Sequence, residues 1–202
     1  MKKFYKFTIF SIILIFFVGC MSSPMKKYYQ IHLENVNMGK SQNIDIKVID
    51  KILLVEKIDI EEIYNDYRLV YRKSPFQLNY YSYKFWIKKP DRVIRDAIVQ
   101  YLSNKKVFNK VIMEFLEWEP DLIMKVRTNI IEEYDIGENW FAHLSMKFKI
   151  IDFKSGEVIL IHKFDRKKRL IIKKVDNIPV CLSKILQEEL DKMINNLSKK
   201  LK

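Results

Sequence analysis

The chain has 202 residues, and its 37 Lys and Arg against 25 Asp and Glu give a formal net charge of +12. Apolar residues make up 49% and aromatic residues 13%, which is too much for an intrinsically disordered chain. Two cysteines exclude a disulfide framework, and four glycines argue against most Gly-rich nucleotide-binding loops. A length near 200 residues is typical of one domain with its own core.

The first twenty residues have the pattern of a bacterial export signal. Three lysines precede a segment, 7–18, that is apolar except for Thr8 and Ser11. A helix of this length rises about 18 Å, short of the roughly 30 Å hydrocarbon core of a bilayer. We therefore interpret residues 1–19 as a signal peptide; the alternative is a short N-terminal membrane anchor.

The end of this segment resembles a bacterial lipobox. Phe17-Val18-Gly19-Cys20 places a cysteine where the apolar run stops, and in lipoproteins that cysteine is acylated and becomes the new N-terminus. Several acyl chains anchor a protein stably, since each buried methylene contributes about 0.8 kcal/mol. We expect lipidation at Cys20 and a lipidated tether over residues 20–27. Met21 is not the aspartate that signals inner-membrane retention, which favours the outer membrane.

The remaining chain, residues 28–202, forms the predicted domain. The pattern of its first half predicts strands followed by a helix. Ser74-Pro75 marks a turn between two of the strands. Pro90 is well placed in the first turn of a helix whose apolar residues recur every three to four positions up to Leu102. The predicted strands are 28–33, 52–55, 68–72 and 77–83.

After Pro120 the apolar period changes to two, and it returns to that of a helix near the C-terminus. A hairpin at Gly156 joins two of the later strands, and a long amphipathic helix begins at Pro179. Adjacent strands joined by hairpins favour an α+β fold: an antiparallel sheet with two main amphipathic helices packed on one face, in a single domain. The predicted later strands are 122–130, 144–150 and 158–164.

No motif in the chain makes a positive case for catalysis, a metal or a cofactor. Gly39-Lys40-Ser41 looks like the end of a phosphate-binding loop, but Glu34 stands where that loop needs its first glycine. His32, His143 and His162 lack the spacing of metal ligands, so we interpret them as polar sheet positions. We expect a protein that is not an enzyme and needs no cofactor.

Two further features have a structural and a functional interpretation. The basic run 166–169, with Lys173-Lys174, suggests either a solvated hairpin or loop, or attraction to anionic lipid headgroups. The export signal argues against nucleic acid as its partner. Cys181 lies between Val180 and Leu182 and is most simply a small buried apolar residue.

The segment 71–86 contains seven aromatic residues within sixteen positions. Alternate residues of a strand point to opposite faces, so one buried face does not accommodate all of them. We expect core packing together with rings left for an interface, where Tyr and Trp are enriched. The partner-docking candidates are Tyr71, Tyr80, Tyr81 and Trp86.

A series of short motifs runs through the chain after the tether. Its members are Ile52-Leu53-Leu54-Val55-Glu56, Tyr71-Arg72-Lys73-Ser74-Pro75, Leu78-Asn79-Tyr80-Tyr81, Trp86 and the helix from Pro90. This series resembles the ABC-type transport auxiliary lipoproteins, the PqiC-like partners of MCE lipid-transport systems. The match covers nearly all of the chain after the tether, including the Gly156 hairpin and the closing helix.

This resemblance implies a non-catalytic component on the periplasmic face of the outer membrane. It implies an MCE-domain protein as partner and, through that protein, an ABC permease and ATPase on separate chains; a homo-oligomeric ring is compatible with it. Two alternatives from other classes are a stand-alone lipid-binding lipoprotein and a structural or assembly lipoprotein of the envelope. A lipid-binding role would need an apolar pocket between sheet and helices.

Overall fold

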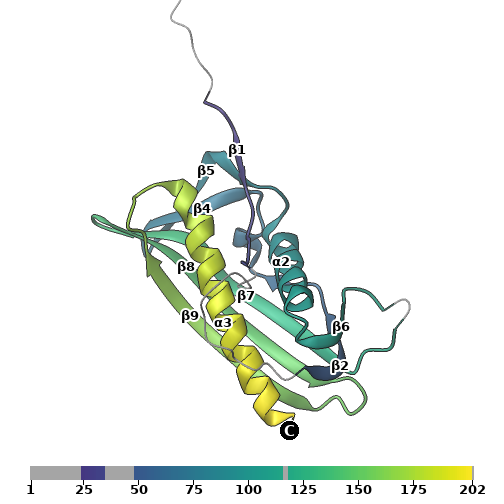
Figure 1. Cartoon of the computed structure of the whole chain (residues 1–202). Coiled ribbons are helices and arrows are strands. Elements are labelled where there is room, and N and C mark those ends of the chain that lie inside the picture. Colours follow the sequence, from purple (N-terminus) through teal and green to yellow (C-terminus); the bar gives the residue numbers. More distant parts are fainter. Residues whose placement is uncertain (1–23, 35–47, 116–117, 202) are drawn as a thin grey trace, which may run out of the picture.

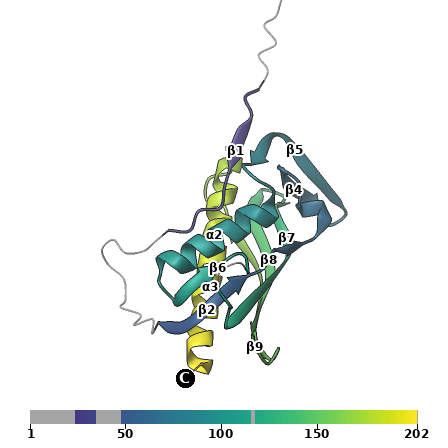
Figure 2. The ribbon, with the colours of Figure 1, turned by 90° about the vertical axis from the view of Figure 1, so that its right-hand side faces the viewer.

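The computed structural model describes residues 24–34, 48–115 and 118–201, and the account below concerns these residues. The predicted signal peptide, Cys20 and Gly39-Lys40-Ser41 lie outside them. In the described part, nine strands form one curled sheet and two α-helices cover one of its faces (Figures 1 and 2). The predicted α+β class with two main helices in a single domain is confirmed.

The elements follow one another in an order that alternates hairpins with longer connections. The first half contains β1 (Lys27–Tyr29), β2 (Ile49–Val55), β3 (Asp59–Ile60), the 3-10 helix η1 (Glu62–Tyr64), β4 (Arg68–Ser74), β5 (Gln77–Trp86) and α2 (Pro90–Asn104). The second half contains β6 (Phe108–Ile112), β7 (Leu122–Ile136), β8 (Asn139–Asp152), β9 (Val158–Arg169), the 3-10 helix η2 (Val175–Asn177) and α3 (Ile178–Lys200).

The sheet is mixed, which corrects the prediction of an antiparallel one. Strands joined by short turns pair antiparallel, as in β4–β5, β7–β8 and β8–β9. Strands from distant parts of the chain pair parallel: β2, β3 and β4 with β7, β2 with β6, and β1 with β5. Parallel pairing requires a long crossover, and the connection from β2 to β6 contains the β4–β5 hairpin and α2. Hairpin signals in the sequence concern strands that are neighbours along the chain, so they do not indicate the parallel pairs between distant strands.

The core lies between the sheet and the two helices. Alternate residues of β7 and β8, such as Met124 and Phe148, are completely buried on the face toward the helices. The apolar stripe of α3, from Leu182 to Leu197, is buried against β8 and β9. This burial explains why a period of two and a period of 3.6 were visible in the sequence, since each element hides one side only.

A bulge in β7 changes which side chains face the helices. Thr128 pairs with Met146, but Ile130 pairs with Ser145, so Asn129 is one residue more than β8 can match. Beyond the bulge, Ile131 stands opposite the buried Leu144 and Glu133 opposite Ala142. Glu133 therefore shares the helix-facing side of the sheet, and its neighbour Glu132 points to the opposite, open face.

Candidate partner-docking site

The aromatic segment forms most of the β4–β5 hairpin, and the structure separates its rings into three environments. Trp86 is 3% exposed and packs in the core. A ring with so little exposed surface has almost nothing to offer a partner, so its burial favours a core role for Trp86 over docking. Tyr71, Tyr80 and Tyr81 are half-buried, and they retain some accessible surface.

Tyr71 and Tyr81 pack against each other in a tilted arrangement on the helix-facing side of the hairpin, with ring centroids 4.6 Å apart. The Tyr81 hydroxyl donates a hydrogen bond to the buried Glu133 carboxylate at 2.9 Å. Burial and the neighbouring Asp135 carboxyl raise the pKa of Glu133 to about 7. Burial also raises the pKa of Asp135. These two rings therefore cover a buried acidic pair and serve the interior at least as much as the surface.

Tyr80 lies on the open face, where the Arg68 guanidinium stacks 4.2 Å from its ring centroid. Its hydroxyl donates to the carbonyl of Ile63 at 2.9 Å, which ties β5 to η1. Net contributions of such hydrogen bonds are about 1 kcal/mol, so Tyr80 has a structural role beside any docking role.

Beneath η1, Glu132 is the centre of a second buried polar cluster. It accepts hydrogen bonds from the Tyr64 hydroxyl at 2.7 Å and from Arg72 Nε at 2.9 Å. His143 Nδ1 lies 3.5 Å from Glu132, and its Nε2 lies 2.7 Å from Asp165. Burial alone would raise the pKa of Glu132, but contacts with His143, Arg72 and Tyr64 outweigh burial and hold it below its usual value. This cluster locks β4, β7 and β8 together.

The exposed aromatic residues of the hairpin are not those singled out from the sequence. Phe76 at the β4–β5 turn is 97% exposed, and Tyr83 is the more exposed of the tyrosines on β5. Ser74-Pro75 was the signal that could have identified Phe76, because the residue after a turn signal lies at a loop tip.

The outer edge of β5 is open over most of its length in the described part of the chain. β4 pairs with one edge, whereas β1 pairs with the other only at Lys84, Phe85 and Trp86. Those backbone groups of residues 77–83 that point away from β4 therefore have no neighbouring strand among the described residues. Such an edge accepts a strand from another chain, and here Phe76 and Tyr83 lie beside it.

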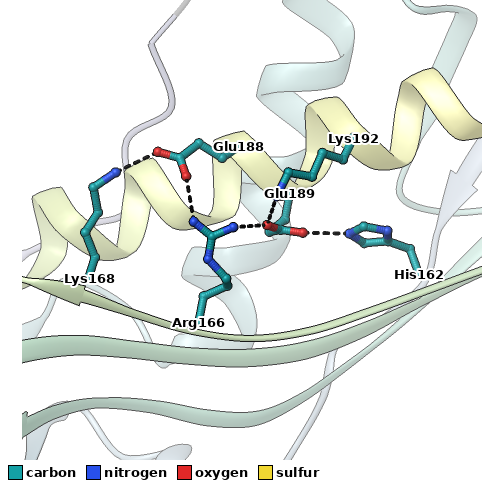
Figure 3. A network of polar contacts seen from close by, with 6 residues as sticks. All are labelled: His162, Arg166, Lys168, Glu188, Glu189 and Lys192. Atoms are coloured by element: carbon teal, nitrogen blue, oxygen red, sulfur yellow. Dashed lines mark hydrogen bonds and ion pairs between the residues drawn. The ribbon is translucent and has the colours of Figure 1, made fainter.

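Of the two structural interpretations, a hairpin or a loop, the first is right: the basic run 166–169 belongs to the end of β9, in the β8–β9 hairpin. Arg166 and Lys168 point toward α3, where they meet Glu188 and Glu189 (Figure 3). Lys167 points to the other face and lies 4.1 Å from the centroid of Tyr134. Half of the run thus holds the last helix onto the sheet.

Glu189 is the buried centre of that contact. Only 3% of the residue is exposed, and its carboxylate lies 2.8 Å from Arg166 and 2.9 Å from His162 (Figure 3). Lys192 donates to it at 2.6 Å from the next turn of the helix. Burial would raise the pKa of Glu189, but Lys192 and His162 hold it below its usual value. Since β9 is a sheet edge, this network holds the middle of α3 against that edge.

The open face of the sheet is strongly basic over β7, β8 and β9. Lys147 stands opposite Arg127 on one side and Lys163 on the other, and Lys149 stands opposite Lys125. Like charges in directly opposite positions repel one another. Asp59 and Glu61 pair with Arg127, whereas Lys147 and Lys163 have no ion pair within the described ranges. This face is suited to an anionic partner.

A depression of about 470 Å³ lies between the 28–34 segment and α3. The segment runs along the helix, because the His32 amide donates to Ser183 at 3.0 Å and the Glu34 amide to Gln187 at 3.0 Å. Most of the lining side chains are polar, whereas sites for small molecules are mostly apolar. A contiguous core fills the space between sheet and helices. Within the described residues, the space between sheet and helices is thus filled by the core, and the depression lies outside it, between the 28–34 segment and α3.

The histidines and the cysteine considered in the sequence make contacts that are typical of structural residues. His143 and His162 each contact a carboxylate, and no group of His, Cys, Asp and Glu within the described residues has the arrangement of a metal site. Cys181 is half-buried, and burial raises the pKa of its thiol. Among the helices that the structure describes, none combines the length and the hydropathy needed to cross a bilayer.

Comparison with known proteins gives a family and several related folds. A family model described as "ABC-type transport auxiliary lipoprotein component" matches residues 33–193. No curated protein matches the sequence. Protein XCC0632 from Xanthomonas campestris is similar in structure, with a TM-score of 0.71 at 14% identity over 86% of this chain and 98% of that one.

Two further solved structures show the same arrangement of helices and strands. A crystal structure described as an uncharacterized protein has a TM-score of 0.68 at 15% identity, covering 86% of this chain and 99% of its own. The hypothetical protein CT253 from Chlamydia trachomatis has a TM-score of 0.53 at 7% identity, covering 74% of this chain and 98% of its own. At these identities the similarity concerns the fold.

Proposed function

Because this chain belongs to the ABC-type transport auxiliary lipoprotein family, we propose that it is the envelope docking component of an MCE-type lipid-transport system. The match over residues 33–193 is the observation that carries the proposal, since it includes α2, most of α3 and most of the sheet. The family name describes an accessory component of an ABC-type transporter and supports a role without catalysis.

The proposed anchor is an acylated Cys20 in the outer membrane, with the domain on its periplasmic side. The apolar segment that ends at Gly19-Cys20 supports this anchor. Lipid chains on Cys20 would hold the domain at a membrane without a spanning helix.

The proposed partner is an MCE-domain protein, which connects to the permease and ATPase at the other membrane. The open edge of β5 and the exposed Phe76 and Tyr83 support docking on the β4–β5 hairpin. An added strand would satisfy the free backbone groups of residues 77–83, and the two rings would supply buried area at low entropic cost. A second copy of the chain could use the same edge, which is the route to a homo-oligomeric ring.

The direct test is affinity purification of the tagged full chain from its own host after mild cross-linking. Mass spectrometry should identify an MCE-domain protein together with the wild-type chain. Substituting Phe76→Ser and Tyr83→Ser together should reduce its yield at least fivefold, while Val158→Ser at the other end of the sheet should leave it unchanged. Recovery of no MCE-domain protein with the wild type would contradict the proposal. A loss seen only with Lys147→Glu would place docking on the basic open face instead.

A further inference from the structure

The loop of residues 171–174, between β9 and η2, exposes two adjacent isoleucines. Ile171 is 99% exposed and Ile172 is 58% exposed, whereas Leu170 beside them is buried. A single exposed aliphatic side chain is ordinary on a protein surface, but two adjacent exposed isoleucines next to Lys173 and Lys174 are a distinct amphipathic feature.

Hydrogen bonds at both ends hold this loop in one shape. The Leu170 amide donates to the carbonyl of Trp140 at 2.8 Å, which fixes the point where the loop leaves the sheet. The Lys174 amide and the Asn177 side chain both donate to the carbonyl of Ile172, at 2.8 and 3.0 Å. The isoleucines are therefore presented outward by a structured turn, and little entropy would be lost if they met an apolar phase.

The loop lies at the end of the molecule where the chain arrives from the proposed lipid anchor. Asp176, two residues after the loop, accepts hydrogen bonds from Lys27 at 2.9 Å and from the Tyr29 hydroxyl, so η2 is tied to β1. Figures 1 and 2 place β1 and the start of α3 at the same end, away from the C-terminus. Lys27 follows Cys20 by seven positions, which limits the distance between the two residues to about 25 Å.

The charges at this end suit an anionic surface. Lys26, Lys173 and Lys174 form no ion pair with a described residue. Lys27 and Lys84 pair with Asp176, and together with the Tyr29 hydroxyl they keep the pKa of its carboxyl well below the usual value. Beside them, Met25 and Tyr28 are exposed on the segment that leads to the anchor.

We propose that the 171–174 loop contacts the bilayer in which the chain is anchored. Ile171 and Ile172 enter the boundary between headgroups and acyl chains, and Lys173 and Lys174 bind the phosphates of anionic lipids. This inference rests on the proposed anchoring at Cys20. Its consequence is orientation: a second contact beside the lipid tether directs α3 away from the membrane, so that its C-terminal end faces the aqueous side.

The test measures the depth of the loop in the full, acylated chain. Cys181→Ala removes the free thiol, and Ile171→Cys is then labelled with an environment-sensitive fluorophore. The matched control is Val158→Cys at the opposite end of β9, where the native side chain is 40% exposed. Twelve strand residues place the two labels about 40 Å apart. Both chains are reconstituted in vesicles of phosphatidylethanolamine and phosphatidylglycerol with nitroxide-labelled lipids.

We expect the label at 171 to shift to shorter wavelength and to be quenched by the lipid nitroxides at least threefold more than the label at 158. Equal quenching at the two positions would overturn the inference. A wavelength shift without lipid quenching would also overturn it, since the loop would then be covered by protein. Cys20→Ser should not remain with the vesicles. If the chain with an intact Cys20 were lost from the vesicles as well, that result would contradict the proposed anchoring and not the loop contact.

A second comparison tests the lysines. Lys173→Glu with Lys174→Glu should lower the quenching at 171 at least twofold in vesicles that contain phosphatidylglycerol. In vesicles of neutral lipids the wild type and this variant should be quenched equally. If the quenching at 171 changed neither with the lysine substitutions nor with the removal of anionic lipid, Lys173 and Lys174 would not bind headgroups, and that part of the proposal would be wrong.

Discussion

The Tyr81 hydroxyl lies 2.9 Å from the carboxylate of Glu133 and covers a buried acidic group whose pKa is raised to about 7. Glu132, the residue before Glu133, is equally buried, but contacts with His143, Arg72 and Tyr64 hold its pKa below the usual value. Two adjacent glutamates of one strand therefore respond to pH in opposite directions.

For Glu133 we expect stability to fall as pH rises from about 4.5 to about 7. In that range the unfolded chain has lost the proton that the folded chain still holds, so the folded state binds more protons and is favoured at lower pH. Over this range the effect is on the order of 3 kcal/mol. Glu133→Gln should remove it, so that urea unfolding at pH 8 shows a variant more stable than the wild type.

Glu132→Gln is the control with the opposite sign. Its contribution is present above the unfolded pKa near 4.5 and is lost as pH falls through the lower folded value. Near pH 7 the substitution leaves Arg72 without its charged partner and leaves His143 with Asp165 alone, and we expect about 3 kcal/mol of destabilisation. If both glutamine variants shifted stability in the same direction at pH 8, the assignment of the two faces would be wrong.

A second prediction concerns the attachment of α3. Glu189→Gln should cost about 1–3 kcal/mol, because a buried carboxylate with three basic partners loses its charge. Glu188→Gln, one residue earlier and much more exposed, should cost less than about 1 kcal/mol. Thermal unfolding near pH 7 measures both. Equal losses would show that the contact between helix and sheet does not depend on Glu189.

The β4–β5 hairpin allows a comparison of a core ring with a surface ring. Trp86→Ala should destabilise the domain by about 3–5 kcal/mol, since it empties a site in the core. Phe76→Ala should change stability by less than about 0.5 kcal/mol, because its ring touches water on nearly all sides. Chemical denaturation measures the free energy of unfolding of both variants. A large decrease for Phe76→Ala would mean that the turn is part of the folded core.

Acylation of Cys20 remains a prediction from the sequence. Metabolic labelling with a fatty acid should mark the wild-type chain and leave Cys20→Ala unlabelled, since the thiol is the site of attachment. Determination of the mature N-terminus provides an independent check. A terminus elsewhere, or equal labelling of the two chains, would contradict the assignment.

The amino-acid pattern was sufficient for the class of fold and for most elements. The period of two in 122–130 and 144–150, and the apolar stripe of the last helix, correspond to β7, β8 and α3. These signals are local: each reflects one element that buries one side, so the residues themselves report it. The same locality made the family resemblance visible, because its motifs are short runs around turns and helix starts.

Other properties were decided only by the tertiary structure. The mixed pairing of the sheet, the burial of Trp86 and the attachment of Arg166 to α3 depend on which distant segments become neighbours. The bulge at Asn129 is the clearest case, since one unmatched residue reverses the faces that Glu132 and Glu133 occupy. Alternation along a strand tells which residues share a side, but register against the neighbouring strands determines which side is buried.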